Sequence, residues 1–177
     1  MRKPMLLPLL LLFLFVLGAA CSDDDNGDAP MVDPMVGLYT IEEAILINDV
    51  VIGEVVIDAG TDITSIINLA LLGDAGCSDA SNTRIDLREG GTIFYLCKTE
   101  DTETQKGTWS INEDRDVLQL RLNISGATVG LNVTEFDEEE LSGNVTNLAV
   151  PTELLVPDSG NGFVVIDMML AFDRDDS

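Results

Sequence analysis

From about residue 36 onward, hydrophobic and polar positions alternate in short runs along the chain. Leu118, Leu120 and Leu122 alternate with polar neighbours, and Val129 and Leu131 begin a second run of the same kind. A period of two places alternate side chains on opposite faces of a β-strand. Strands with one apolar face and one polar face are typical of antiparallel sheets that cover a core on one side only.

Nine stretches of the chain have strand character and are separated by clusters of turn residues. They lie near residues 37–47, 50–58, 83–88, 92–98, 107–112, 117–123, 128–136, 141–148 and 162–172. Most of the connections are too short for the crossovers that parallel strands require, so consecutive strands should pair as antiparallel neighbours. Closing such a sheet removes its exposed edges. We therefore predict an all-β fold, an up-and-down antiparallel barrel of eight to nine strands.

The segment 62–72 departs from the strand pattern. Its apolar residues at 63, 66, 67, 70 and 71 fall on one face of a helix, Thr61 or Asp62 can cap the start, and Gly73 can end it. We predict one short helix between the second and third strands, against the sheet or across one mouth of the barrel. The β-branched residues in the segment leave a strand as the alternative.

The N-terminus has the composition of an export signal. Arg2 and Lys3 precede an uncharged apolar stretch at 6–17, which is shorter than the ~20 residues of a spanning helix. The small residues Gly18, Ala19 and Ala20 follow. We expect residues 1–20 to be removed as a signal peptide.

Cys21 follows directly, and the sequence Leu17-Gly18-Ala19-Ala20-Cys21 resembles the lipobox of bacterial lipoproteins. The resemblance implies that Cys21 is lipidated and that the protein is held at the membrane by its lipid. It departs at Gly18, where an aliphatic residue is usual, and cleavage by the ordinary signal peptidase is the alternative.

The acidic run 22–28 resembles the surface-export signal of Bacteroidota-type lipoproteins. That resemblance implies an outer-membrane protein that faces the cell surface. The run also suits a solvated tether, so we assign 21–35 to a lipidated cysteine with a flexible linker and 36–177 to the barrel domain. The run does not match the EF-hand pattern of a calcium-binding loop, because Ser22 would stand at the first position, where the pattern requires Asp.

Charge and composition exclude several kinds of function. The chain has 9 Lys and Arg, 32 Asp and Glu, and no His, and removal of residues 1–20 leaves a formal charge of −25. Such a charge opposes nucleic-acid binding, and the lack of His excludes Ser-His, Cys-His and His-ligated metal chemistry. The acidic clusters Glu42-Glu43 and 138–140 indicate solvated charge and at most weak cation binding. We expect no enzymatic activity, no cofactor and no specific metal site.

Cys77 and Cys97 remain once Cys21 is assigned to the anchor. Export places them in an oxidising compartment, where an even number of cysteines favours a disulfide. Two buried free thiols are the alternative.

Several motifs together resemble bacterial lipocalin-like lipoproteins. Gly37-Leu38-Tyr39 is similar to the Gly-x-Trp of lipocalins, with Tyr39 in place of tryptophan. Cys77 and Cys97 bracket a hairpin with a Gly-Thr turn at 90–92, and Gly107-Thr108-Trp109 matches a strand of that family. The long segment 147–162 departs from the family and leaves closure of the last strand open.

The resemblance implies a barrel that holds a small apolar ligand. Residues expected to line its core or cavity are Tyr39, Trp109, Leu118, Leu120 and Leu131. The leading hypothesis is thus a surface-tethered binder of an apolar ligand. The alternative is a non-catalytic interaction module of an outer-membrane protein assembly, which would use the loops 73–82 and 151–162.

Overall fold

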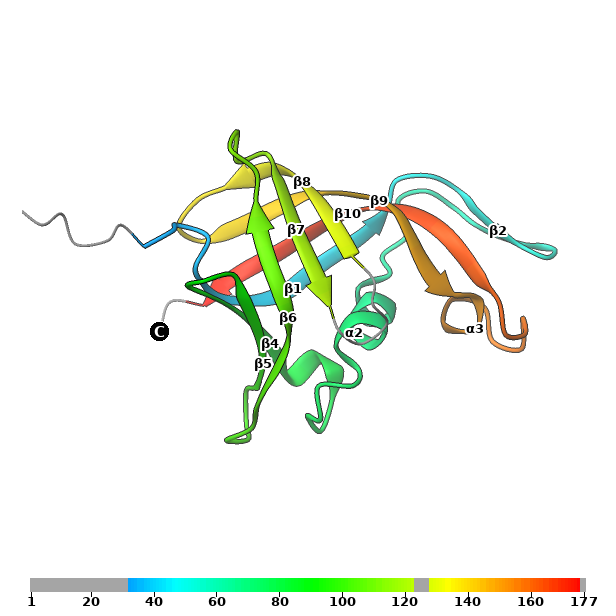
Figure 1. Cartoon of the computed structure of the whole chain (residues 1–177). Helices are drawn as coiled ribbons and strands as arrows, with labels where there is room; N and C mark the ends of the chain where they lie inside the picture. The colour runs from blue at the N-terminus through cyan, green and yellow to red at the C-terminus, as the bar shows by residue number, and fades with distance from the viewer. Residues whose placement is uncertain (1–31, 123–127, 176–177) are drawn as a thin grey trace, which may run out of the picture. The chain divides into compact units, whose positions relative to one another are not determined.

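The computed structural model describes residues 32–122 and 128–175, and within them eight antiparallel strands form a closed barrel (Figure 1). Their order around the barrel is β1-β10-β9-β8-β7-β6-β5-β4, which confirms the predicted all-β, up-and-down fold. The strands are β1 (Gly37–Leu46), β4 (Thr83–Arg88), β5 (Thr92–Cys97), β6 (Glu103–Ile111), β7 (Val117–Leu122), β8 (Thr128–Phe136), β9 (Glu140–Pro151) and β10 (Phe163–Asp175).

The last strand closes the barrel. β10 pairs with β1 from Leu38 opposite Asp175 to Leu46 opposite Met168, and β1 also pairs with β4. Three strands are longer than the sequence pattern predicted: β6 begins at Glu103, β9 reaches Pro151 and β10 reaches Asp175. Pairing with a neighbouring strand extends β6 and β10 into polar sequence, whereas β9 continues through the apolar residues 149–151.

The predicted second strand at 50–58 is wrong as a barrel strand. This segment forms a separate two-stranded hairpin of β2 (Val50–Ile52) and β3 (Val55–Ile57). Gly53 has a φ of +63° at the first position of the two-residue turn, which suits a type II′ hairpin. The barrel therefore has eight strands, and the β2–β3 hairpin stands outside it.

The predicted helix is present as α2 (Thr64–Leu72), and its Ile67 and Leu72 are buried in the same core as the barrel residues. Asp62 accepts a hydrogen bond from the Thr64 amide at 2.8 Å. Gly73 ends the helix with a φ of −61°, so its freedom to adopt a left-handed conformation is not used. Ile63 donates its amide to the Ala44 carbonyl at 2.8 Å, which places α2 at the end of the barrel where β1 ends.

Two projections extend beyond the barrel at this end (Figure 1). The hairpin arm is β2–β3, residues 50–57. The β9–β10 arm consists of Leu148–Pro151, the short helix α3 (Thr152–Leu155) and Phe163–Ile166, together with the loop that joins them. In this arm, β9 and β10 pair only with each other among the described residues, because the pairing of β10 with β1 ends at Met168 and that of β9 with β8 ends at Val145.

Candidate functional site

The five residues that were predicted to line the barrel are all buried inside it. Leu118 and Leu131 are 0% exposed, Tyr39 is 1% exposed, and Leu120 and Trp109 are 5% and 8% exposed. Their neighbours in the core come from every strand of the barrel and from α2. These residues therefore form a common hydrophobic core.

Side chains fill the interior of the barrel. A cavity large enough for water would give the atoms that line it accessible surface. Ile93, Leu118, Leu131 and Met168, which come from four different strands, have none. Across the residues described, the interior is packed as protein cores are packed, and a ligand there would have to displace side chains.

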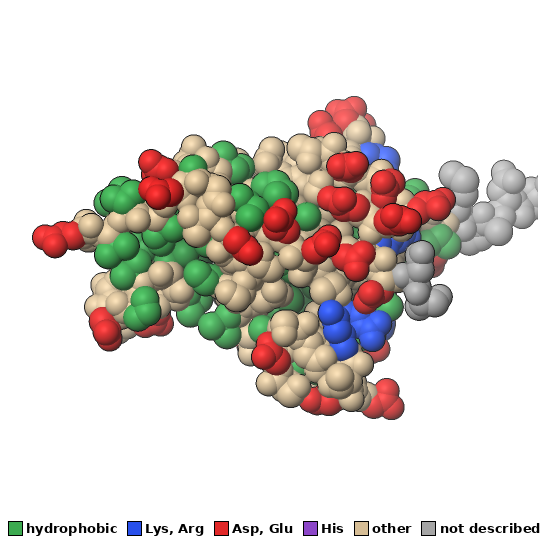
Figure 2. Space-filling view, turned by 180° about the vertical axis from the view of Figure 1, so that it is seen from behind, with side chains coloured by type: hydrophobic (Ala, Val, Ile, Leu, Met, Phe, Trp, Pro, Cys, Tyr) green, Lys and Arg blue, Asp and Glu red, His purple; other side chains and the backbone are tan. Residues whose placement is uncertain are grey.

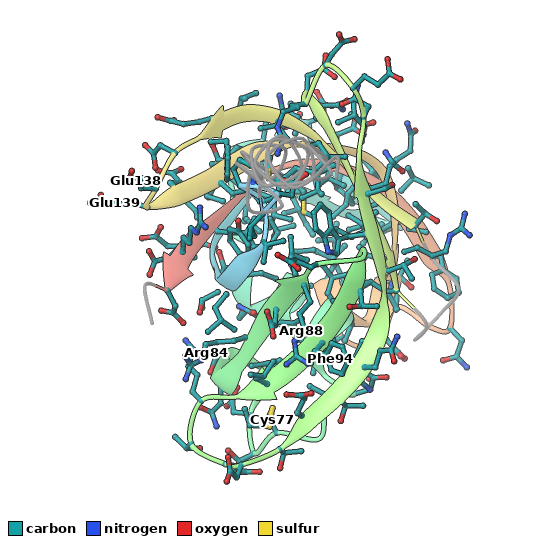
Figure 3. All side chains as sticks on the ribbon, turned by 60° about the vertical axis from the view of Figure 1, so that its left-hand side comes forward. Cys77, Arg84, Arg88, Phe94, Glu138 and Glu139 are labelled. Carbon is teal, nitrogen blue, oxygen red and sulfur yellow. A yellow bond between two sulfur atoms is a disulfide. The ribbon has the colours of Figure 1, made fainter. Side chains whose placement is uncertain are left out.

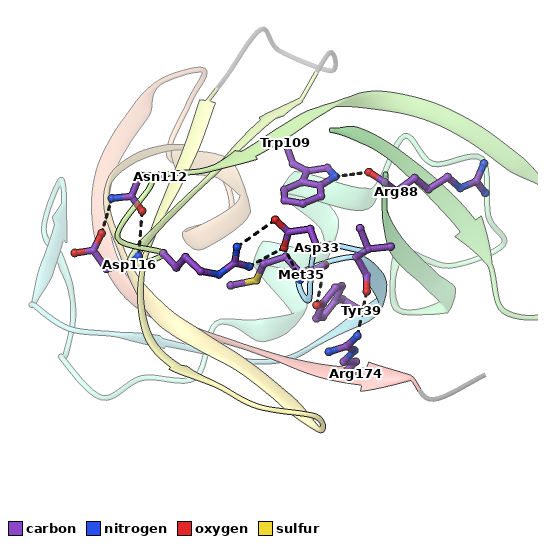
Figure 4. Close-up of polar contacts among 10 residues, drawn as sticks. Asp33, Met35, Tyr39, Arg88, Trp109, Asn112, Asp116 and Arg174 are labelled. Atoms are coloured by element: carbon purple, nitrogen blue, oxygen red, sulfur yellow. Dashed lines mark hydrogen bonds and ion pairs between the residues drawn. The ribbon is translucent and has the colours of Figure 1, made fainter. Parts of the chain in front are cut away.

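The segment that precedes β1 closes the end of the barrel that lies opposite α2 and the arms (Figure 4). Asp33 accepts two hydrogen bonds from the Arg115 guanidinium, at 2.7 and 3.2 Å, and the buried Met35 follows it. The Tyr39 hydroxyl donates to the Met35 carbonyl at 3.0 Å. These contacts begin before residue 36, where the domain was expected to start. This end of the barrel is sealed by the chain itself.

The titratable groups at this end of the barrel stabilise the fold through their contacts with one another and with the backbone. Hydrogen bonds from Arg115 hold the pKa of Asp33 below its usual value. Burial raises the pKa of Tyr39 and keeps its phenol neutral. Arg174 lies 5.9 Å from the centre of the Tyr39 ring and donates to the Val36 carbonyl at 3.0 Å.

Trp109 is held by a hydrogen bond within the core. Its indole Nε1 donates to the Arg88 carbonyl at 2.9 Å. The Arg88 side chain lies over the Phe94 ring, 3.9 Å from its centre (Figure 3). It also forms ion pairs with Asp86 and Glu103. Hydrogen bonds from Arg88 lower the pKa of Glu103. The contacts of Trp109 thus explain its place in the core without a ligand.

Cys77 and Cys97 form the predicted disulfide. It ties the loop after α2 to the end of β5, and Lys106 ties the same loop to β6 by donating to the Asp74 carbonyl at 2.9 Å. An open hollow of about 580 Å³ lies between this loop and the outer face of α2, with Ser65 and Asn68 among its lining residues. The loop 73–82, which was predicted as a contact loop, is therefore fixed at several points.

The two arms carry most of the large hydrophobic side chains that are exposed. In the hairpin arm, Val51, Val55 and Val56 are 62%, 44% and 56% exposed, and in the β9–β10 arm Phe163 and Val165 are 75% and 58% exposed. Figure 2 shows hydrophobic side chains gathered at the end of the molecule from which the arms project. Soluble proteins seldom leave such patches without a binding role.

Asp167 joins the bases of the two arms. Its carboxylate accepts from the Asn48 side-chain amide at 3.0 Å and from the Asn147 backbone amide at 2.9 Å. Its carbonyl accepts from the Ile47 amide at 3.0 Å. Asn147, where β9 leaves β8, has a φ of +59°. The arms therefore project from a common hydrogen-bonded base.

The segment 151–162, which the sequence predicted as a contact loop, contains α3 and lies in the β9–β10 arm, whereas the hairpin arm was not predicted. The signal was present, because Gly53-Glu54 divides two identical runs, Val50-Val51-Ile52 and Val55-Val56-Ile57. Cys21, which was predicted to be lipidated, and the acidic run 22–28, including the calcium loop that the sequence argued against, lie outside the described residues.

The acidic clusters have structural surroundings. Asp137 accepts hydrogen bonds from the Glu139 and Glu140 amides, both at 2.8 Å, and so shapes the turn between β8 and β9. Glu42 and Glu43 are exposed where the β1–β10 register shifts. In the described residues no three His, Cys, Asp or Glu side chains come together as metal ligands.

Comparison with models of protein families gives no match, and comparison with curated proteins gives no similar sequence. None of the helices described is long and apolar enough to span a membrane. The class that the structure defines is a closed eight-stranded antiparallel barrel with a filled interior and two apolar arms.

Proposed function

We propose that this chain is an exported lipoprotein, anchored to the bacterial outer membrane through Cys21, whose barrel is a non-catalytic module that binds another protein. The export signal, the lipobox-like sequence and the acidic run 22–28 support the anchor and the surface location. The observation that carries the binding role is the exposed hydrophobic surface of the two arms beside a filled barrel interior.

The filled interior favours the second of the two binding functions expected from the sequence, the interaction module. A small-molecule pocket has a volume of about 300–1,000 Å³ and buries most of its ligand. The side chains inside this barrel have little or no accessible surface, so the ligand hypothesis stays a prediction that the packing does not favour. Native mass spectrometry after incubation with lipid extracts tests it, and a retained apolar molecule would return the proposal to a ligand carrier.

The anchor is tested by metabolic labelling with a fatty acid. We expect label in the wild-type protein, none in Cys21→Ser, and unchanged label in the neighbouring control Ser22→Ala. Protease treatment of intact cells tests the location, and we expect cleavage of the wild-type protein that diminishes when Asp23, Asp24 and Asp25 are changed to Asn. Equal labelling of Cys21→Ser would refute the anchor.

The binding role is tested by chemical cross-linking in solubilised outer membranes, with the full lipidated chain as bait. We expect a defined cross-linked product that contains a second protein and survives an excess of unrelated acidic protein. Recovery of the bait alone, under conditions where a known outer-membrane complex cross-links, would refute the proposed function.

A further inference from the structure

We propose that the two arms bind an extended apolar segment of a partner protein, and that this segment carries lysine or arginine. The inference rests on the proposed function and names the kind of partner and the surface that receives it. It is built from the open strand edges of the arms, their apolar faces and their charge.

The β9–β10 arm has an open strand edge. Val164 and Ile166 lie opposite Val150 and Leu148. The Thr152 amide donates to the Gly162 carbonyl, and because hydrogen-bonded pairs alternate along an antiparallel ladder, Val164 and Ile166 are hydrogen-bonded to β9. The backbone groups of Phe163 and Val165 therefore point away from β9, towards the side where β1 has already ended. They have no backbone partner among the described residues.

The hairpin arm has open edges for the same reason. Ile52 and Val55 flank the two-residue turn, so Val51 and Val56 form the pair whose backbone groups point outward. An exposed strand with unpaired backbone groups is a template for another strand unless charge or proline protects it. The runs Val50–Ile52 and Phe163–Ile166, which form these open edges, contain neither.

The apolar faces of the arms offer hydrophobic surface that an added strand would bury. Val51 and Val56 are paired across the hairpin and share its outer face. Phe163 and Val165 alternate along β10, so they share one face, while Ile166 on the other face is 1% exposed. Recognition of an extended peptide by strand addition combines main-chain hydrogen bonds with contacts to alternate side chains, and both are available here.

Charge identifies the chemistry of the partner. The ionic side chains of the arms and their bases are acidic, and Lys and Arg are absent from 44–83 and from 122–173. The acids are Asp49, Glu54, Asp58, Glu153, Asp158 and Asp167. A second copy of this chain would bring like charges together, whereas a basic segment would be attracted and oriented. An apolar and basic strand therefore fits this surface.

The experiment uses the full lipidated chain in detergent and three synthetic ten-residue peptides with a fluorescent label. The test peptide alternates Val with Lys, a second peptide has Thr in place of Val, and a third has Glu in place of Lys. We expect binding of the Val-Lys peptide at least tenfold tighter than that of the Thr-Lys peptide, and no binding of the Val-Glu peptide. Affinity should fall as salt increases.

Matched variants locate the site. Val51→Thr with Val56→Thr, and Phe163→Thr with Val165→Thr, keep strand-compatible side chains and remove apolar surface. We expect either pair to weaken binding about tenfold or more, because each loses two apolar contacts. The control Val32→Thr changes a valine as exposed as Val56, 56% in both cases, in the segment that enters the barrel, and should leave the affinity unchanged.

Several results would overturn the proposal. Equal binding of the Val-Lys and Thr-Lys peptides would show attraction by charge alone, and equal loss with Val32→Thr would show binding elsewhere. A stable homodimer that the arm variants dissociate would show that the occupant is a second copy. If the peptides fail while the full chain still cross-links to a second protein, the arm proposal falls and the proposed function stands.

Discussion

Asp167 accepts a hydrogen bond from the Asn48 side chain at 3.0 Å, and this contact connects two arms that lie far apart in the sequence. The same carboxylate accepts from the Asn147 amide at 2.9 Å. One side chain thus fixes where the hairpin arm leaves β1 and where β9 leaves the barrel. The arms are held at their bases, and each also buries one apolar face, with Val50 and Ile52 in the hairpin arm and Val150 and Ile166 in the β9–β10 arm.

We predict that Asp167→Ala loosens both arms together. Loss of the two contacts should lower the free energy of unfolding by about 1–2 kcal/mol, since hydrogen bonds to a charged group are stronger than the average. Hydrogen exchange should accelerate at 50–57 and 148–151, with little change in β5 and β6. The exposed Glu153→Ala in the same arm, where the carboxylate has no side-chain hydrogen bond within the described chain, is the control. Acceleration confined to one arm would contradict the shared base.

The alternation of apolar and polar residues predicted the barrel because, in each strand, the apolar side chains all face the interior. Leu118, Leu120 and Leu122 are buried at 0%, 5% and 5% exposure, and the residues between them point outward, as a period of two requires. Gly53 shows where the same logic failed. With Glu54 it divides two short β-branched runs that were predicted as one strand, and the pairing of Val50 with Ile57 shows that the segment folds back on itself.

The candidate site was harder to predict than the fold. The sequence identified residues that face the interior, but whether they fill it depends on how strands far apart in the chain are paired. The arms are exposed because β1 ends at Leu46, whereas β10, which runs the other way, begins at Phe163 and so extends beyond the end of β1. The polar run Glu103–Lys106 extends β6 only because β5 is there to pair with it. Such lengths are set by neighbours and not by local sequence.

We predict that Leu131→Ala lowers the free energy of unfolding by about 2–5 kcal/mol, the range for removing a large side chain from a packed core. Leu131 has no accessible surface, whereas Leu69 on α2 is 53% exposed and serves as the control. Leu69→Ala should change the stability by about 0.5 kcal/mol or less. Urea unfolding monitored by circular dichroism measures both. Similar small effects in the two variants would mean that the barrel interior is loosely packed.

We predict that the disulfide stabilises the barrel by about 3 kcal/mol, the value expected when a bridge closes a loop of this length. Cys77 and Cys97 are separated by 20 residues. The double variant Cys77→Ala with Cys97→Ala should unfold at correspondingly lower urea. In a Cys21→Ser chain, thiol titration should find no free thiol before reduction and two after it. Two free thiols without reductant would contradict the bridge.

The ion pair of Asp33 with Arg115 should contribute to stability at neutral pH and not in acid. Hydrogen bonds from Arg115 lower the pKa of Asp33 in the folded protein. Its contribution is fully present above the unfolded pKa of about 3.9 and is lost as the pH falls through the lower folded value. Since the pair is partly exposed, Asp33→Asn should cost about 0.5–1 kcal/mol at neutral pH.

The side-chain amide introduced by Asp33→Asn keeps an acceptor oxygen for the Met35 backbone amide, which donates to the Asp33 carboxylate at 2.9 Å, so charge is the main change. The difference between Asp33→Asn and wild type should disappear towards about pH 2. Asp114→Asn, a change in the same turn as Arg115, is the control and should be neutral. A difference that persists unchanged in acid would show that packing, and not charge, is responsible.

The two tyrosines should resist ionisation as long as the barrel is folded. Burial raises the pKa of both phenols, and the charge of Asp74 adds to the effect at Tyr95. The Tyr95 hydroxyl donates to the Leu71 carbonyl of α2 at 3.1 Å, and that of Tyr39 donates to the Met35 carbonyl. Each hydroxyl thus keeps its proton for a contact that closes one end of the barrel.

The sign of the effect follows from these raised values. The neutral phenols contribute stability that is fully present below the unfolded pKa of about 10 and is lost as the pH rises through the folded values. The chain has only two tyrosines, so tyrosinate absorbance reports on these two alone. We expect no tyrosinate at about pH 10, where free tyrosine is half ionised, and a steep rise together with loss of circular dichroism. Tyr39→Phe should halve the final absorbance and leave the transition cooperative, whereas ionisation of both groups near pH 10 in a folded barrel would contradict their burial.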